Sequence, residues 1–165
     1  MKAGGPPPRF SEAALQEIGR IYARYPKERH QSALMPILHL AQKEFGGWLS
    51  VEALDYVAEF MGIPNMRVYE VATFYTMYNL KPVGRYHVQV CTNISCWLCG
   101  SETVVKTLEK KLGLGVGKTD DEGRFTLTEV ECLGACVHAP VMQINDDYYE
   151  HLTAEQVAEI VDRLP

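Results

Sequence analysis

The sequence predicts an α+β protein in which an N-terminal helical bundle precedes a smaller domain of mixed helices and strands. Apolar residues recur at helical spacing through the first half of the chain, whereas the alternation typical of strands appears only after residue 84. The chain has 165 residues, 47% of them hydrophobic and 22% charged, which is ordinary for globular domains. We therefore expect a flexible lead-in at residues 1–9, a helical bundle at 10–80 and a second domain at 84–165.

Four helices are expected in the bundle, because start and stop signals separate its apolar stripes. Ser11 is placed to cap the first helix, which Pro26 ends. The second carries Pro36 near its start and ends at a Gly-Gly pair. The third begins after Ser50, and the fourth follows Pro64 and runs to the aromatic residues at 74–75.

The second domain is predicted to follow the order β-α-β-β-β-α. The expected elements are a strand at 86–90, a helix at 98–112, a strand at 125–128, a hairpin at 141–149 and a last helix opened by a Thr153–Gln156 capping box. This order is typical of a thioredoxin-like domain, so the fold expected for the whole chain is a helical bundle followed by a thioredoxin-like β-α-β-β-β-α domain.

Charge and hydropathy exclude several classes of protein. Residues 1–80 carry eight basic and eight acidic side chains, whereas residues 81–165 carry eight basic and thirteen acidic ones, for a net charge of −5. This distribution does not suit a nucleic-acid binder. No apolar run reaches the roughly 18 residues of a membrane span, and residues 1–8 lack the apolar core of a signal peptide. We expect a soluble intracellular protein without a nucleotide-binding motif of its own.

Five cysteines lie within residues 91–136, and their number and clustering argue against a disulfide scaffold. Cys91 ends one predicted strand, and Cys132 ends the strand that follows the crossover helix. Parallel strands joined by a helix bring their carboxyl ends to the same edge of a sheet. Two loops, each with two thiols, are therefore expected to meet and form a four-thiolate site.

Three chemistries fit these thiols. An iron–sulfur cluster is favoured over zinc, because the four- and three-residue spacings are wider than the C-x2-C pairs of structural zinc sites. Thiol–disulfide chemistry at Cys96-x2-Cys99 is the third. The spacing Cys91-x4-Cys96-x2-Cys99 also matches the plant-type ferredoxin pattern, which would leave one of Cys132 and Cys136 unused. We interpret Cys99 instead as a small buried thiol in the first turn of a helix, packed beside the site.

Three segments carry a resemblance to a known family: CTNISC at 91–96, ECLGAC at 131–136 and RVYEVATFY at 67–75. From about Phe10 to Leu164 the chain resembles the thioredoxin-like 2Fe–2S subunit of respiratory complex I, the NADH-quinone oxidoreductase. The resemblance implies that Cys91, Cys96, Cys132 and Cys136 ligate a 2Fe–2S cluster, with Cys99 as an additional thiol.

The resemblance also implies a function. The chain would be an electron-transfer subunit in a heterodimer with the FMN/NADH-binding subunit, among the other peripheral-arm subunits of NADH:quinone oxidoreductase, with FMN and NADH on the partner. It would have no active site of its own and would lie on the cytoplasmic side of a bacterial inner membrane, with a mature mitochondrial matrix protein less favoured. The alternatives are the equivalent subunit of a soluble NAD-linked formate dehydrogenase or hydrogenase, and a thiol–disulfide oxidoreductase using Cys96 and Cys99.

Several neighbours are expected to affect the cluster. Glu102, Glu129 and Glu131 would oppose the added electron, and Gly134 would bring backbone close to a sulfur. A cis peptide at Ala139–Pro140 is a further hypothesis.

Apolar side chains near the site leave two interpretations open. Trp97 would cap the cluster or pack in the core. Phe74, Tyr75, Met77 and Tyr78 would be core residues or contacts to the larger partner.

Overall fold

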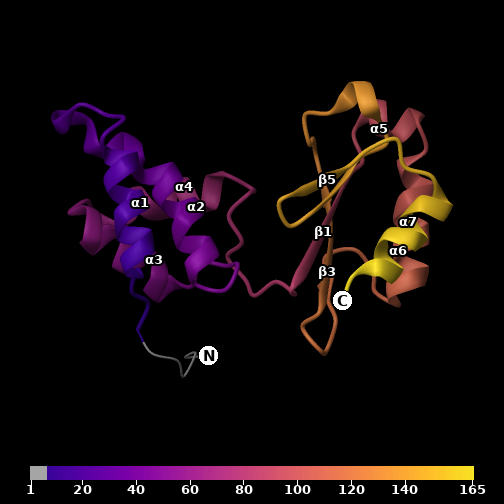
Figure 1. Ribbon diagram of the computed structural model, residues 1–165, viewed down its shortest axis with the longest axis horizontal. Coiled ribbons are helices and arrows are strands. Elements are labelled where there is room, and N and C mark those ends of the chain that lie inside the picture. The colour runs from indigo at the N-terminus through magenta and orange to yellow at the C-terminus, as the bar shows by residue number, and fades with distance from the viewer. Residues whose placement is uncertain (1–6) are drawn as a thin grey trace. The chain divides into compact units, whose positions relative to one another are not determined.

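The computed structural model describes residues 7–165, so most of the expected lead-in at 1–9 lies outside the described residues. The chain divides into two compact units, Met1–Pro82 and Val83–Pro165, seen in Figure 1 as a helical unit and a unit built on a sheet. Within the described range, no helix combines the length and the apolar character needed to cross a bilayer.

The helical unit begins and ends its helices largely where the sequence signals predict. Its elements are α1 (Glu12–Tyr22), the 3-10 helix η1 (Lys27–Ala33), α2 (Leu34–Glu44), α3 (Val51–Met61) and α4 (Asn65–Phe74). Ser11 and Ser50 accept hydrogen bonds from backbone N–H groups three residues later, as expected of N-caps. Two details differ from prediction. The first helix ends at Tyr22, four residues before Pro26, and η1 was not predicted.

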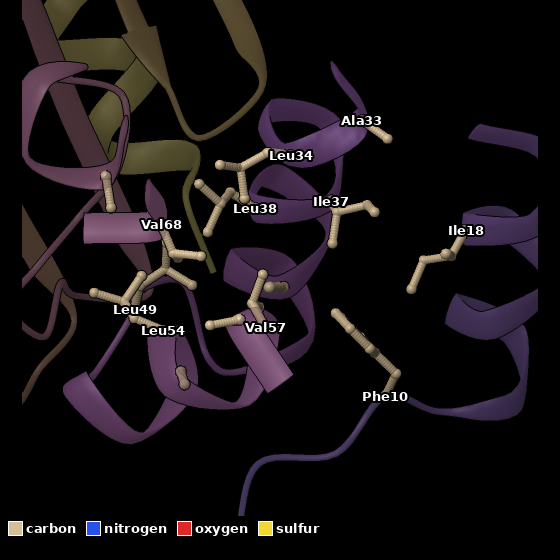
Figure 2. Close-up of a cluster of buried hydrophobic side chains, with 14 of the residues drawn as sticks. Phe10, Ile18, Ala33, Leu34, Ile37, Leu38, Leu49, Leu54, Val57 and Val68 are labelled. Carbon is tan, nitrogen blue, oxygen red and sulfur yellow. The ribbon is translucent and has the colours of Figure 1, made fainter. Parts of the chain in front are cut away.

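The core of the helical unit is built from the apolar stripes of these helices (Figure 2). Ile37, Leu38, Val57 and Val68 are fully buried there. Phe10 lies in the same core, where its ring stacks on that of Phe45. The unit therefore buries a core of its own.

The second unit contains a five-stranded mixed sheet. Its elements are β1 (Tyr86–Cys91), α5 (Ile94–Leu98), α6 (Ser101–Leu112), β2 (Lys118–Thr119), β3 (Phe125–Val130), η2 (Cys136–His138), β4 (Met142–Ile144), β5 (Asp147–Tyr149) and α7 (Ala154–Arg163). The strand order is β2-β3-β1-β4-β5. β1 is parallel to β3, from Tyr86 opposite Phe125 to Cys91 opposite Val130, and the other pairs are antiparallel. The predicted α+β class and the parallel pair are confirmed; the short β2 was not predicted.

Two helices, α6 and α7, lie on one side of the sheet in Figure 1. Leu108 of α6 and Val157 of α7 are fully buried in one cluster with Val88 of β1 and Leu127 of β3. The capping box at Thr153 and Gln156 is confirmed.

The predicted single helix at 98–112 is wrong in one respect. The structure has two helices, α5 and α6, separated at Gly100, whose φ of 94° lies in the left-handed region that favours glycine. This break places Cys99 at the end of α5 instead of in the first turn of the long helix.

Candidate metal centre

The cysteines lie at the sheet edge where the parallel strands β1 and β3 both end. Cys91 is the last residue of β1, and Cys96 lies in α5 just beyond it. Cys132 and Cys136 lie in the loop that follows β3, which we call the second cysteine loop (residues 131–138). The two segments touch, because the Cys91 thiol donates to the carbonyl oxygen of Glu131 at 3.8 Å.

Two of the thiols are buried. Cys91 and Cys96 are 2% and 1% exposed and pack with Val141. The pKa of the Cys96 thiol is raised to about 11, first by burial and then by hydrogen bonding with Cys91, against a hydrogen bond with the Val141 backbone that lowers it. Because metal binds thiolate, loading the site releases protons.

Cys132 is exposed, and its sulfur already accepts a backbone hydrogen bond. The N–H of Gly134 donates to Cys132 Sγ at 3.3 Å. Gly134 has a φ of 76°, a conformation that favours glycine. The expectation that Gly134 brings backbone close to a sulfur is therefore confirmed.

The number and type of donors fit a 2Fe–2S cluster. A 2Fe–2S cluster takes four thiolates, two on each iron, and the two segments supply two cysteines each. Among residues 7–165, no three His, Cys, Asp or Glu side chains are grouped to hold one metal ion.

Cys99 does not lie where the sequence pattern predicts. It is exposed, not buried, and it follows the last residue of α5. Its neighbour in the C-x2-C pair, Cys96, is buried and has a raised pKa. A catalytic thiol of the thioredoxin type needs the opposite, a lowered pKa and access to substrate.

An apolar rim lies beside the cysteines. Ile94, Trp97 and Leu98 of α5 and Val137 of the second cysteine loop are 70%, 55%, 72% and 85% exposed. Trp97 is thus not a core residue; its indole Nε1 donates to Glu102 at 3.0 Å. We call these four residues the apolar rim.

Other predicted neighbours are now placed. Glu129 and Glu131 are exposed, and the Ala139–Pro140 peptide is cis, as hypothesised. In the helical unit, Tyr78 is a core residue whose hydroxyl donates to the Met35 carbonyl at 3.0 Å.

Three neighbouring side chains of the helical unit behave differently from Tyr78. Phe74 is 76% exposed and lines a shallow hollow with Tyr75, while Met77 is 39% exposed. These three side chains therefore belong to the surface.

Sequence reasoning missed two residues that contact the second cysteine loop. The Tyr148 hydroxyl donates to the Leu133 carbonyl at 3.0 Å. Glu150 Oε2 lies 2.7 Å from His138 Nδ1. No local motif marks these residues, because only the fold of the β4–β5 hairpin brings them to the loop.

Comparison with known proteins bears on the fold and the cofactor. The family model described as thioredoxin-like 2Fe–2S ferredoxin matches residues 18–165. The chain belongs to this family. Membership in the thioredoxin-like 2Fe–2S ferredoxins confirms the resemblance and the cofactor drawn from the sequence, a 2Fe–2S cluster. Which cysteines ligate the cluster stays a prediction.

Individual relatives of this thioredoxin-like ferredoxin are similar over most of its length. An NADH-quinone oxidoreductase subunit of Rickettsia conorii is 53% identical over 155 residues, 94% of this chain and 93% of that protein. The mitochondrial NADH dehydrogenase [ubiquinone] flavoprotein 2 of Dictyostelium discoideum is 50% identical over 94% of this chain and 63% of its own length.

A solved structure of an NAD+-reducing NiFe hydrogenase in the H2-reduced state has a TM-score of 0.68 and 19% identity over 80% of this chain. This ferredoxin spans 23% of the length of that hydrogenase chain, and the likeness concerns the fold alone.

Proposed function

We propose that this chain is the 2Fe–2S electron-transfer subunit of an NADH-quinone oxidoreductase, next to the subunit that binds FMN and NADH. The observation that carries the proposal is the parallel β1–β3 edge, where the two segments that carry the cysteines contact each other. Relatives above 50% identity that are named as subunits of NADH-quinone oxidoreductase support the choice of complex over a formate dehydrogenase or hydrogenase. The chain then works as part of an enzyme, without an active site of its own.

Within this proposal, Cys91, Cys96, Cys132 and Cys136 are the thiolate ligands. The cluster supplies one-electron chemistry, accepting and returning a single electron. Burial of Cys91 and Cys96 keeps water from the inner side of the site. The Gly134 N–H group at the Cys132 sulfur would stabilise the reduced form and raise the potential.

The apolar rim supports the proposed docking to the FMN/NADH-binding subunit. Four large apolar side chains are exposed on the segments that carry the cysteines, where a partner would exclude water from the electron path. The rim carries the docking proposal independently of the ligand assignment. The complex would place this chain on the cytoplasmic side of a bacterial inner membrane.

Anaerobic EPR of the reduced protein, with iron and sulfide analysis, tests the ligand set. We expect two irons and two sulfides per chain, loss of the signal in Cys136→Ser and an unchanged signal in the matched Cys99→Ser variant. An intact cluster in Cys136→Ser together with its loss in Cys99→Ser would assign the plant-type spacing instead. A colourless protein with one zinc would contradict the proposed function.

Co-purification with the FMN/NADH-binding subunit tests the docking surface. Leu98→Asp and Val137→Asp should lower recovery of the partner while the cluster spectrum is kept. Val51→Asp is the matched control, because Val51 is also an exposed valine (62%), in the first turn of α3. Equal recovery with all three variants would remove the apolar rim from the interface.

A further inference from the structure

Tyr148 of β5 reaches across to the second cysteine loop. Its hydroxyl donates to the carbonyl oxygen of Leu133 at 3.0 Å. The backbone N–H of the next residue, Gly134, donates to Cys132 Sγ at 3.3 Å. The Leu133 carbonyl and the Gly134 N–H belong to one peptide group, so a single planar unit joins Tyr148 to a sulfur.

The geometry of that peptide group couples its two hydrogen bonds. Of the peptide bonds in residues 7–165, the Ala139–Pro140 bond alone is cis, so the Leu133–Gly134 peptide is trans. The C=O and N–H of a trans peptide point in opposite directions from a rigid plane. Fixing the carbonyl with the Tyr148 hydroxyl therefore fixes the direction of the N–H. Hydrogen bonds in such a chain also polarise one another, which strengthens the N–H as a donor.

The same hairpin holds the other end of the loop. The His151 N–H donates to the His138 carbonyl at 2.8 Å, and Glu150 pairs with the His138 ring at 2.7 Å. The segment that contains Gly134 and Cys136 lies between these anchors and the Tyr148 contact. With both ends held, loss of one hydroxyl would change the orientation of one peptide without releasing the loop.

We propose that Tyr148 is a positioning residue that tunes the reduction potential of the cluster through the Leu133–Gly134 peptide. The inference rests on the proposed function, which makes Cys132 a ligand. The reduced cluster carries one more negative charge than the oxidised one, and an N–H aimed at a ligand sulfur stabilises that charge. Removing the Tyr148 hydroxyl frees the peptide to turn, weakens the N–H···S bond and lowers the potential.

A potentiometric titration followed by EPR tests this inference on the full-length, cluster-loaded protein. In Tyr148→Phe, the ratio of reduced to oxidised cluster at a fixed ambient potential should fall about two- to tenfold, the range spanned by net hydrogen-bond strengths. Iron content should not change, because Tyr148 is 48% exposed and its ring is kept. Tyr149→Phe is the matched control, since the neighbouring hydroxyl makes no hydrogen bond within residues 7–165.

Three results would overturn the inference, and they can be told apart from failure of the proposed function. An unchanged potential in Tyr148→Phe overturns the inference alone, as does an equal shift in Tyr149→Phe. The third comes from Cys132→Ser, which should abolish or alter the EPR signal. If the spectrum and iron content of Cys132→Ser match those of the unmodified protein, Cys132 is not a ligand and the proposed ligand set falls together with the inference.

Discussion

Replacement of Gly84 by alanine should damage the pairing of β1 with β3, the two strands that carry the cysteines. Gly84 lies two residues before β1, and its N–H donates to Thr126 Oγ1 at 2.6 Å. A Cβ at this position would lie 2.7 Å from the carbonyl carbon of Phe125, 2.8 Å from its nitrogen and 2.9 Å from the carbonyl carbon of Arg124. The obstacle is backbone, so no side chain can rotate away.

The size of the effect follows from these distances. Ordinary van der Waals contact for a Cβ begins at 3.4 Å, so the two strands must separate by about 0.7 Å near this point. Overpacking of this kind costs about 1–3 kcal/mol, and the rigid obstacle places Gly84→Ala at the upper end, about 3 kcal/mol. For a unit of this size, about 3 kcal/mol lowers the melting temperature by about 12–24 °C.

Urea unfolding followed by circular dichroism measures the loss, and the visible absorbance of the cluster shows whether the cysteines still meet. Gly115→Ala is the matched control, because a Cβ there meets nothing within 4 Å and its φ is not positive. We expect a stability change of less than about 0.5 kcal/mol for this control. If Gly84→Ala loses no more stability than Gly115→Ala, the close strand approach does not constrain the sheet and the reasoning is wrong.

Three further variants test single interactions. Tyr78→Phe should lower the free energy of unfolding of the helical unit by about 1 kcal/mol, because it removes a buried hydrogen bond to Met35; an unchanged urea midpoint would contradict this. Thr153→Ala should cost about 1 kcal/mol, because it removes the hydroxyl that accepts from the Gln156 N–H; Thr153→Ser, measured in parallel, should retain most of that stability. Burial lowers the pKa of His87, so the unfolded chain takes up a proton first. The contribution of neutral His87 to the free energy of unfolding should therefore be fully present above about pH 6.5. It should be lost as the pH drops toward the lowered pKa of His87 in the folded protein. In His87→Gln, the free energy of unfolding from urea titrations should depend less on pH between about pH 7 and 5.5 than in the unmodified protein. Equal slopes in the two proteins would show that His87 does not cause the pH dependence.

Local signals in the sequence were reliable where a side chain caps the free N–H groups at the start of a helix. Ser11, Ser50 and Thr153 were predicted as caps and all three accept the expected hydrogen bonds. The break at Gly100 was missed because the apolar stripe continues through it, and the positive φ of a glycine leaves no mark in hydrophobic periodicity.

For the site as well, the sequence predicted some features and missed others. The meeting of the two cysteine segments was predicted, because a right-handed crossover between parallel strands leaves little choice of where their ends lie. Burial of individual thiols was not predicted: Cys99 was expected inside and is exposed, whereas Cys91 and Cys96 are enclosed. Burial depends on the path of α5, which no spacing rule determines.

The sequence by itself therefore determined the α+β class and the positions of the main helices and strands, because periodicity and caps act over a few residues. It also predicted four cysteines as ligands of a 2Fe–2S cluster. The tertiary structure decided which thiols are buried, how closely Gly84 approaches Phe125, and that Tyr148 contacts the second cysteine loop. These features depend on contacts between residues far apart in the chain, which form only when the sheet and its hairpin have assembled.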